Sequence, residues 1–394
     1  MLAAHSSDPS ETKAESDVAV PISLQSALMS RLDKLGAVKA VAQTAAVIGR
    51  EFDLKTLAHV VGLSSEVYAP YGYMTDEGSD AYRNVMRLSE ATRDPEAAIR
   101  ALDGLFGTSF NSARFSDAEW ASNQLKEIGR RDSNIKALVL GLQFGGMCAF
   151  ARGRFPQARE VLLEALEHRE HAHEVGSDFP SMSMLYLSWT LQILGEADTA
   201  MELFHAAEME TRGQADYRLA AYLGNGCILM SLRQDVATLA RLVDELVPLA
   251  TRNGFQLWLN FASFFSGWVK AASSQDSSCL AQMKQICDNM GDQEVDKTCY
   301  LGVLTDSYLR MGRIDEATAA LDQGLKLAGR TGEHYYMPEL LRLRGELLRQ
   351  TDRPAAAKRS FEEAISFARD QGAKAWEARA KPSLDLLSSD PPQR

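Results

Sequence analysis

The 394 residues, 45% of them hydrophobic and 24% charged, are typical of a soluble globular protein and exclude a disordered or fibrous one. The 53 Asp and Glu residues exceed the 42 Lys and Arg residues, and the resulting net charge of −11 disfavours nucleic acid and anionic membranes as partners. No segment is long and apolar enough to span a membrane, and the five scattered cysteines lack C-x-x-C spacing, so we expect a cytoplasmic protein without a disulfide framework or a zinc site.

The N-terminal part is predicted to contain a disordered leader, a small helical module and a connector. Residues 1–19 are polar and acidic, without the apolar run of a signal peptide. Residues 20–62 form the helical module, because its first helix has four leucines at helical spacing, Leu24, Leu28, Leu32 and Leu35. Ser23 can cap that helix, and residues 38–48 and 53–61 have the pattern of two more helices. Residues 63–80 have no such pattern.

A short element recurs along the rest of the chain at a nearly constant period. A turn residue is followed five positions later by a small residue, as in Gly153 and Ala158. The other copies begin at Ala113, Gly195, Gly312 and Asp352, with weaker copies that end at Thr238 and Cys279. The small residues stand at 118, 158, 200, 238, 279, 317 and 357, so the period is close to 40 residues. Such a period predicts a helical-repeat architecture.

Each repeat has the pattern of two packed helices. Another small residue lies twelve positions before the first one, at Gly146, Ser188, Gly226, Gly267, Thr305 and Gly345, although Phe106 occupies this position in the first copy. An apolar residue lies four positions after the first small residue, at Leu162, Phe204, Leu321 and Phe361. The small residues allow two helices to approach closely, and the apolar residues mark the buried face of the second helix. The pattern therefore predicts a helix hairpin in each repeat.

We therefore predict an all-α fold, in which residues 81–380 form a right-handed superhelical solenoid of tetratricopeptide-like helix hairpins. The period near 40 residues exceeds the 34 of the tetratricopeptide family and implies longer loops between repeats. Residues 381–394 contain Pro382, Pro391 and Pro392 and are expected to form a disordered tail.

The first helices of such a solenoid line its concave face, which is the usual binding surface of repeat proteins. The residues predicted to bind a partner there are Met147, Phe150, Trp189, Gln192, Met230, Phe264, Trp268, Asp306, Glu339 and Arg342. Apolar groups in the middle repeats and charged groups near the end would suit an amphipathic helix or an extended peptide. In the alternative interpretation, aromatic residues such as Phe264 and Trp268 pack against neighbouring hairpins.

Catalytic, cofactor-binding and metal-binding residues are not predicted. His168 and His171 could share one helical face, but we interpret them as part of a solvated helix end. The sequence contains no G-x-x-x-x-G-K-[ST] motif to hold a triphosphate, and no Ser or Cys has the local pattern of an activated nucleophile. We therefore expect a protein that is not an enzyme.

Residues 20–62 and 115–375 resemble a region of bacterial signal-transduction ATPases, including those fused to class III adenylate or guanylate cyclases. The residues that carry the resemblance are the leucine-rich run from Val20 to Leu35, the stretch Asn253–Trp258, and Gly332–Tyr336 with the following Leu343–Leu348. The resemblance implies a truncated winged-helix-like module followed by a tetratricopeptide-like region. It also implies a regulatory region without the nucleotide-binding or cyclase domain.

These observations lead to three functional hypotheses. The first is a signalling scaffold or sensor that binds a protein or peptide on its concave face. The second is a piece of a transcription regulator in which the module at 20–62 contacts DNA, although this module lacks a basic recognition helix. The third, implied by the resemblance alone, is control of a separate cyclase or ATPase. The sequence leaves a homo-oligomer open.

Overall fold

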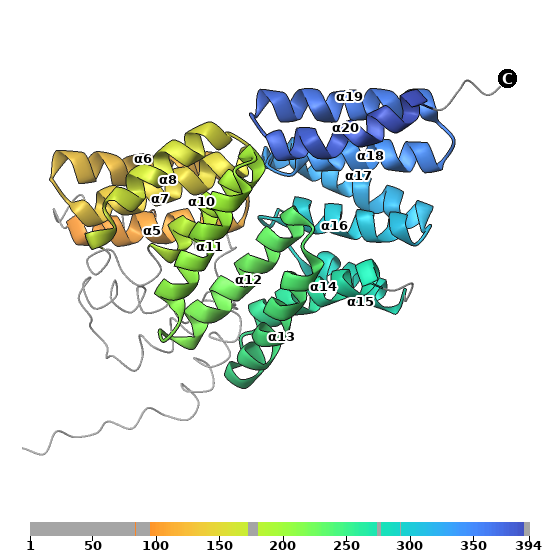
Figure 1. The fold of residues 1–394 in the computed structure, drawn as a ribbon. Coiled ribbons are helices and arrows are strands. Elements are labelled where there is room, and N and C mark those ends of the chain that lie inside the picture. Colours follow the sequence, from red (N-terminus) through yellow and green to blue (C-terminus); the bar gives the residue numbers. More distant parts are fainter. Residues whose placement is uncertain (1–82, 84–94, 172–179, 274–276, 292, 390–394) are drawn as a thin grey trace, which may run out of the picture. The chain divides into compact units, whose positions relative to one another are not determined.

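A computed structural model describes residues 83, 95–171, 180–273, 277–291 and 293–389 of the chain. The chain divides into two units, Met1–Glu66 and Val67–Arg394, and all the described residues belong to the second unit. The predicted leader, helical module and connector lie outside the described residues, as does the end of the tail from residue 390. The described part is a stack of α-helices, which confirms the predicted all-α helical-repeat solenoid (Figure 1).

Seven consecutive helix hairpins make up the stack, and each of the seven repeats predicted from the sequence corresponds to one of them. Hairpins 1 to 7 are α5 (Pro95–Asn111) with α6 (Phe115–Arg131), α7 (Ile135–Ala151) with α8 (Phe155–Glu167), α10 (Ser181–Leu194) with α11 (Ala197–Thr211), α12 (Asp216–Arg233) with α13 (Val236–Asn253), α14 (Gln256–Ser273) with α15 (Ser278–Asn289), α16 (Lys297–Arg310) with α17 (Ile314–Thr331), and α18 (Met337–Gln350) with α19 (Pro354–Asp370). A short 3₁₀ helix, η1 (Arg169–His171), follows α8, and α20 (Lys374–Ser389) packs against hairpin 7.

The turn residues found in the sequence have the backbone conformation that ends a helix. The five that begin the clear copies have positive φ angles, at Ala113 (49°), Gly153 (75°), Gly195 (91°), Gly312 (67°) and Asp352 (54°). A left-handed residue after a helix reverses the chain and satisfies the free carbonyl groups of the last turn. Glycine adopts this conformation without strain, and Asp does so more readily than most residues. The five-residue spacing is thus the geometry of a tight turn between two helices.

The two helices of a hairpin meet at the small residues that the sequence marks. A Cβ atom added to Gly146 would lie 2.4 Å from Leu162, and one added to Gly345 would lie 2.4 Å from the ring of Phe361. In hairpin 3 the equivalent residue is a serine, and the hydroxyl of Ser188 donates a hydrogen bond of 2.6 Å to the carbonyl oxygen of Ala200. Hairpin 1 has Phe106 here, and its ring stacks on Phe144 of α7 at a centroid distance of 3.7 Å.

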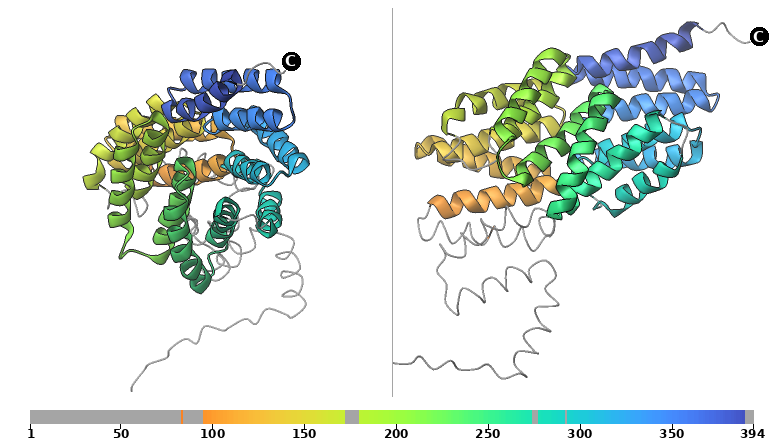
Figure 2. Two further views of the ribbon diagram at one scale, coloured as in Figure 1. Left: turned by 45° about the vertical axis from the view of Figure 1, so that its right-hand side comes forward. Right: turned by 60° about the horizontal axis from the view of Figure 1, so that its bottom comes forward.

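The helices of each hairpin differ in how much of their surface they bury. The first helices have few exposed residues, since they contact their own second helix on one side and the neighbouring hairpins on the other. The second helices are amphipathic and bury a single stripe, which in α19 includes Ala357, Phe361 and Ala364. Within the described unit the hairpins follow a curve (Figure 2). This curve brings α20, the last helix, into contact with α10.

The tail predicted from Lys381 onward is helical as far as Ser389, so this boundary was wrong. Pro382 lies inside α20 and removes one backbone donor. The helix continues because later residues are held by hairpin 7: the hydroxyl of Ser383 donates a 2.6 Å hydrogen bond to Glu346, and Leu384 packs beside Leu341 and Ile365. Among the described helices, none is long and apolar enough to cross a membrane.

Candidate partner-binding surface

The residues predicted to line an open groove are largely buried. Seven of the ten are buried, namely Met147, Phe150, Trp189, Met230, Phe264, Trp268 and Glu339, whereas Gln192, Asp306 and Arg342 are partly exposed. Phe264 has an exposed fraction of 0% and lies 4.3 Å, between ring centroids, from Tyr300 of the next hairpin. The packing alternative is therefore confirmed for Phe264, and the exposed aromatic side chains that binding on an open concave face would require are not found at these positions. Binding of a partner by these residues stays a prediction.

The groove is closed because late segments of the solenoid bind the ends of early first helices. The backbone N–H of Val295, in the loop after hairpin 5, donates a 2.9 Å hydrogen bond to the carbonyl oxygen of Asn111, the last residue of α5. The N–H groups of His334 and Tyr335, in the loop after hairpin 6, donate to the carbonyl oxygen of Ala151 at the end of α7, at 2.8 and 3.2 Å. We call these bonds the closing contacts.

A third set of closing contacts involves α20, the helix after hairpin 7. This helix packs against α10, and the side chain of Lys374 lies beside Gly195 at the end of hairpin 3's first helix. The guanidinium of Arg379 donates a hydrogen bond to the carbonyl oxygen of Leu232, near the end of α12. The last carbonyl groups of a helix have no intrahelical donor, so the ends of first helices are natural acceptors for a segment that approaches them.

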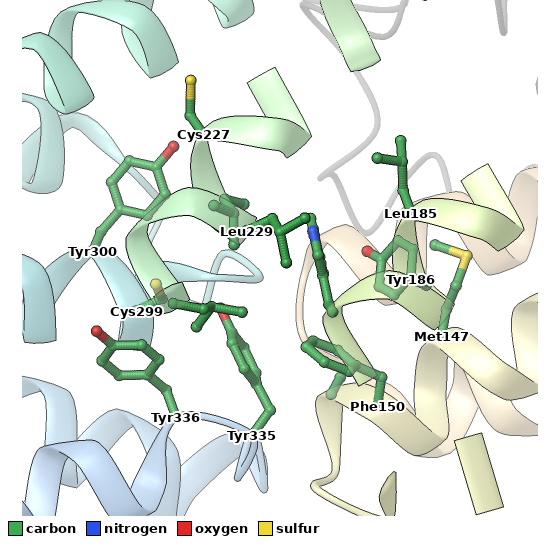
Figure 3. Packing of buried hydrophobic residues seen from close by; sticks show 14 of the residues in the cluster. Met147, Phe150, Leu185, Tyr186, Cys227, Leu229, Cys299, Tyr300, Tyr335 and Tyr336 are labelled. Atoms are coloured by element: carbon green, nitrogen blue, oxygen red, sulfur yellow. The ribbon is translucent and has the colours of Figure 1, made fainter. Parts of the chain in front are cut away.

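Aromatic rings fill the space beneath the closing contacts (Figure 3). Tyr335 lies between Phe150 of α7 and Tyr336, at centroid distances of 4.8 and 5.9 Å. Phe150 also contacts Tyr186 and Trp189 of α10. The loop before α18 therefore packs its two tyrosines into the interior, instead of presenting them to a ligand.

Two carboxyl groups lie beside these tyrosines: that of Glu333 is buried, with an exposed fraction of 1%, and that of Asp296 is half-buried. Asp296 precedes α16 and Glu333 lies in the loop before α18. The backbone N–H of Asp296 donates a 2.7 Å hydrogen bond to Glu333 Oε1, and the Thr298 hydroxyl donates one of 2.6 Å to Glu333 Oε2. The Tyr335 hydroxyl donates to Asp296 Oδ1 at 2.8 Å. We call Asp296 and Glu333 the acid pair.

Burial changes the titration of the acid pair. Loss of hydration raises the pKa of Asp296 to about 6, although the Tyr335 hydroxyl opposes this shift. The pKa of Glu333 is raised to about 8, mainly by loss of hydration and in second place by repulsion from Asp296. Within the described part of the chain, neither carboxyl group forms an ion pair with Lys or Arg. The protonated form is therefore favoured in this interior.

A third carboxyl group, that of Glu339, is buried in the opposite environment. Glu339 of α18 lies 2.8 Å from Arg342 and 3.3 Å from Arg379 of α20, measured between nitrogen and oxygen atoms. These two guanidinium groups outweigh the loss of hydration and hold the pKa of Glu339 at about 2. The guanidinium of Arg379 also lies over the ring of Trp376 at 4.7 Å. Two of the predicted groove residues, Glu339 and Arg342, thus act in an internal ion cluster.

Sequence reasoning did not find Asp296, Glu333 or Arg379. The two acids lie in loops between repeats, where the periodic pattern carries no information about side-chain position. Arg379 lies in a helix beyond the last repeat. The one available signal was the stretch Gly332–Tyr336, which contributes to the family resemblance. Across the described ranges, no three His, Cys, Asp or Glu side chains gather in an arrangement that could hold a metal ion.

Comparisons with known proteins find similar chains among solved structures. No family model and no curated protein matches the sequence. Among solved structures, the chain is similar to a tetratricopeptide repeat protein from Parabacteroides merdae, with 14% identity, a TM-score of 0.40, and coverage of 79% of this chain and 100% of that one. It is also similar to a Rap protein in complex with competence and sporulation factor, with 13% identity, a TM-score of 0.48, and coverage of 79% and 97%.

Proposed function

We propose that the chain is a non-catalytic scaffold or sensor that binds a protein or peptide on the inner face of its solenoid. The observation that carries this proposal is the double hydrogen bond at Ala151. Its carbonyl oxygen accepts the N–H groups of His334 and Tyr335, which belong to a non-helical segment, and the Tyr335 ring packs against Phe150. A non-helical segment of a partner with an aromatic side chain could present the same groups.

In this proposal the partner replaces the loop after hairpin 6. Main-chain hydrogen bonds would provide affinity, and the pocket that holds Tyr335 would select an aromatic anchor. The predicted residues Phe150 and Trp189 would then contact the partner, since Phe150 lies 4.8 Å from Tyr335 and 5.5 Å from Trp189 between ring centroids. Because the partner would bind only molecules whose closing contacts are open, the apparent affinity would equal the intrinsic affinity multiplied by the fraction of open molecules.

The proposal is tested by capture of partners from lysate, followed by calorimetric titration of the purified partner. Three proteins are compared: the wild type, Arg379→Ala, which removes a closing contact at Leu232, and Arg359→Ala, a control on the exposed face of α19. We expect Arg379→Ala to bind the partner more tightly and Arg359→Ala to bind like the wild type, with circular dichroism confirming that all are folded. Equal affinity of all three proteins would exclude the inner face and direct the search to the outer helices.

The wider role in signalling rests on the resemblance of residues 20–62 and 115–375 to bacterial signal-transduction ATPases. Since that resemblance implies regulation of a catalytic domain carried elsewhere, we propose that the partner includes such a domain. Addition of the purified chain to a candidate ATPase or cyclase, with the rate of nucleotide turnover as the readout, tests this extension separately from the site on the inner face.

A further inference from the structure

The acid pair is placed directly at the closing contacts. Asp296 follows Val295, whose N–H binds the end of hairpin 1, and Glu333 precedes His334, whose N–H binds the end of hairpin 2. The hydrogen bond from the Asp296 N–H to Glu333 Oε1 joins the two loops next to these closing contacts. A change of charge on either acid therefore acts on the residues that close the solenoid.

We propose that Asp296 and Glu333 form a pH-sensitive latch, which holds hairpins 6 and 7 closed on hairpins 1 and 2 while the pair carries a proton and releases them when both groups are ionised. The proposal concerns the conformation of the free protein. It therefore stands or falls independently of a binding partner on the inner face.

The groups around the acid pair do not neutralise a second negative charge. Those that interact with it electrostatically come from α10, α16 and the two loops, and they are Tyr186, Cys299, Tyr300, Tyr335 and Glu294. All of them are neutral or negative near pH 7. Lys297 follows Asp296 in the chain, but its ammonium donates to the carbonyl oxygens of Met290 and Gly291 at 2.9 and 3.1 Å. An ionised Glu333 would lack hydration, and it would be repelled by the half-buried carboxylate of Asp296.

Release from the closed position would return water to both carboxylates. In the closed state, a protonated Glu333 can keep its bond to Thr298, because a hydroxyl group both donates and accepts. Once Glu333 is ionised, separation of the loop from Ala151 relieves the repulsion, and the two N–H groups at 334 and 335 become free to exchange with solvent. The closing contacts at Ala151 are thus the observable part of the latch.

The direction of the pH dependence follows from the protons bound in each state. The closed state holds the proton to a higher pH than an open state with solvated carboxyl groups, so the closed state loses relative stability as pH rises. For the pKa values of about 6 for Asp296 and about 8 for Glu333, the ratio of open to closed molecules should rise by roughly ten- to a hundredfold between pH 6 and pH 8. Above the pKa of Glu333 the ratio should level off.

Low pH is also expected to destabilise the closed state, through His334. Burial, and after it the nearby Arg152, lowers the pKa of His334, so the closed state favours the neutral imidazole. Protonation of His334 below its ordinary pKa would therefore also weaken the closing contacts. The latch should be tightest in mildly acidic solution, between the titration of His334 and that of Glu333.

Hydrogen exchange of the full-length protein, followed by mass spectrometry on the peptide that contains residues 332–336, tests the latch. Rates are measured from pH 6 to pH 9 and divided by the intrinsic exchange rate at each pH. We expect protection in the wild type to fall by roughly ten- to a hundredfold from pH 6 to pH 8 and to change no more than about twofold in Glu333→Gln, which mimics the protonated acid. Glu362→Gln, on the exposed face of α19, should follow the wild type.

Constant protection in the wild type, or an unchanged fall in a folded Glu333→Gln, would overturn the latch. If Glu333→Gln does not fold, Asp296→Asn provides the second test. Asparagine tolerates the positive φ of 66° at this position and keeps the hydrogen bond from Tyr335. Because it removes the repulsion that raises the pKa of Glu333, the loss of protection should be complete at a lower pH than in the wild type. A profile identical to the wild type would contradict the role of the pair.

Discussion

The interior of a hairpin and the closing contacts hold the solenoid together in different ways. In hairpin 7, Phe361 packs on the surface left by Gly345, and the contact is apolar and fully buried. At the closing contacts, late loops bind the carbonyl oxygens of Asn111 and Ala151 beside the acid pair. The hairpin interior depends on close packing and neutral hydrogen bonds, whereas the closing contacts also depend on charge. The hairpins therefore form the fixed part of the fold, and closure is the part that solution conditions can adjust.

The largest effect is expected from loss of the apolar packing in a hairpin. Phe361→Ala should lower the free energy of unfolding by about 3–5 kcal/mol, because it removes a buried ring and leaves a cavity between α18 and α19. Urea unfolding followed by circular dichroism measures this change. Leu386→Ala, at a side chain with an exposed fraction of 65%, should change the value by less than about 0.5 kcal/mol. Similar losses in both variants would show that packing in hairpin 7 is not decisive.

The ion cluster around Glu339 should contribute the next largest effect, and it depends on pH in the opposite direction to the acid pair. The pKa of Glu339, about 2, lies below the ordinary value of 4.5. The ion cluster therefore stabilises the folded protein above pH 4.5, and this stabilisation is lost as pH falls towards 2. The full shift corresponds to about 3 kcal/mol. Glu339→Gln should therefore be less stable than the wild type at pH 7, and the difference should shrink in acid. A difference that stays constant from pH 7 to pH 3 would contradict this.

A smaller loss is expected when a side chain is added at the close approach of two helices. Gly345→Ala places a methyl group against the ring of Phe361 and should destabilise the protein by about 1–3 kcal/mol, despite the better helix propensity of alanine. Gly329→Ala is the matched control, since a Cβ atom there has no neighbour within 4 Å, and it should stabilise α17 by up to about 1 kcal/mol. Unfolding midpoints that move in the same direction for both variants would refute the close approach.

The smallest effect is expected at a hairpin turn. Asp352 has a φ angle of 54°, and its replacement by glycine should remove strain and raise the free energy of unfolding by up to about 1 kcal/mol. At the equivalent turn, Gly312 has a φ angle of 67°, and Gly312→Ala should lower it by a similar amount. Thermal unfolding of both variants measures the pair of changes, and a loss of stability in Asp352→Gly would show that its side chain matters more than its backbone.

The hairpins could be predicted from the sequence because their determinants are local. A turn residue such as Gly153 and a small residue such as Ala158 lie five positions apart. The helix that contains Ala158 packs against Gly146 of the preceding helix in the same repeat. Such contacts depend only on helix geometry and on the turn between the helices. The same reasoning identified Phe264 as a residue that could pack on a neighbouring hairpin.

Closure could not be predicted because it depends on small rotations summed over several repeats. Ala151 and Tyr335 are 184 positions apart in the sequence and meet only because of the angles between successive hairpins. Those angles are set by loops that carry no periodic pattern, including the loops of Asp296 and Glu333. The sequence therefore left two interpretations of the aromatic residues on the concave side, contact with a partner and packing against neighbouring hairpins.

The register of the closing contacts has a consequence for how such a chain can grow. Hairpins 1, 2 and 3 each meet the segment that follows the hairpin four places later, through Val295, through His334 and Tyr335, and through Lys374. Duplication of a middle hairpin would bring a different loop to each early helix end, and none of the present pairs would survive. Duplication of hairpin 1 leaves every pair intact, whereas duplication of hairpin 7 separates Lys374 from Gly195 and keeps the other two pairs. Duplication should therefore be tolerated best at the start of the solenoid and least in its centre.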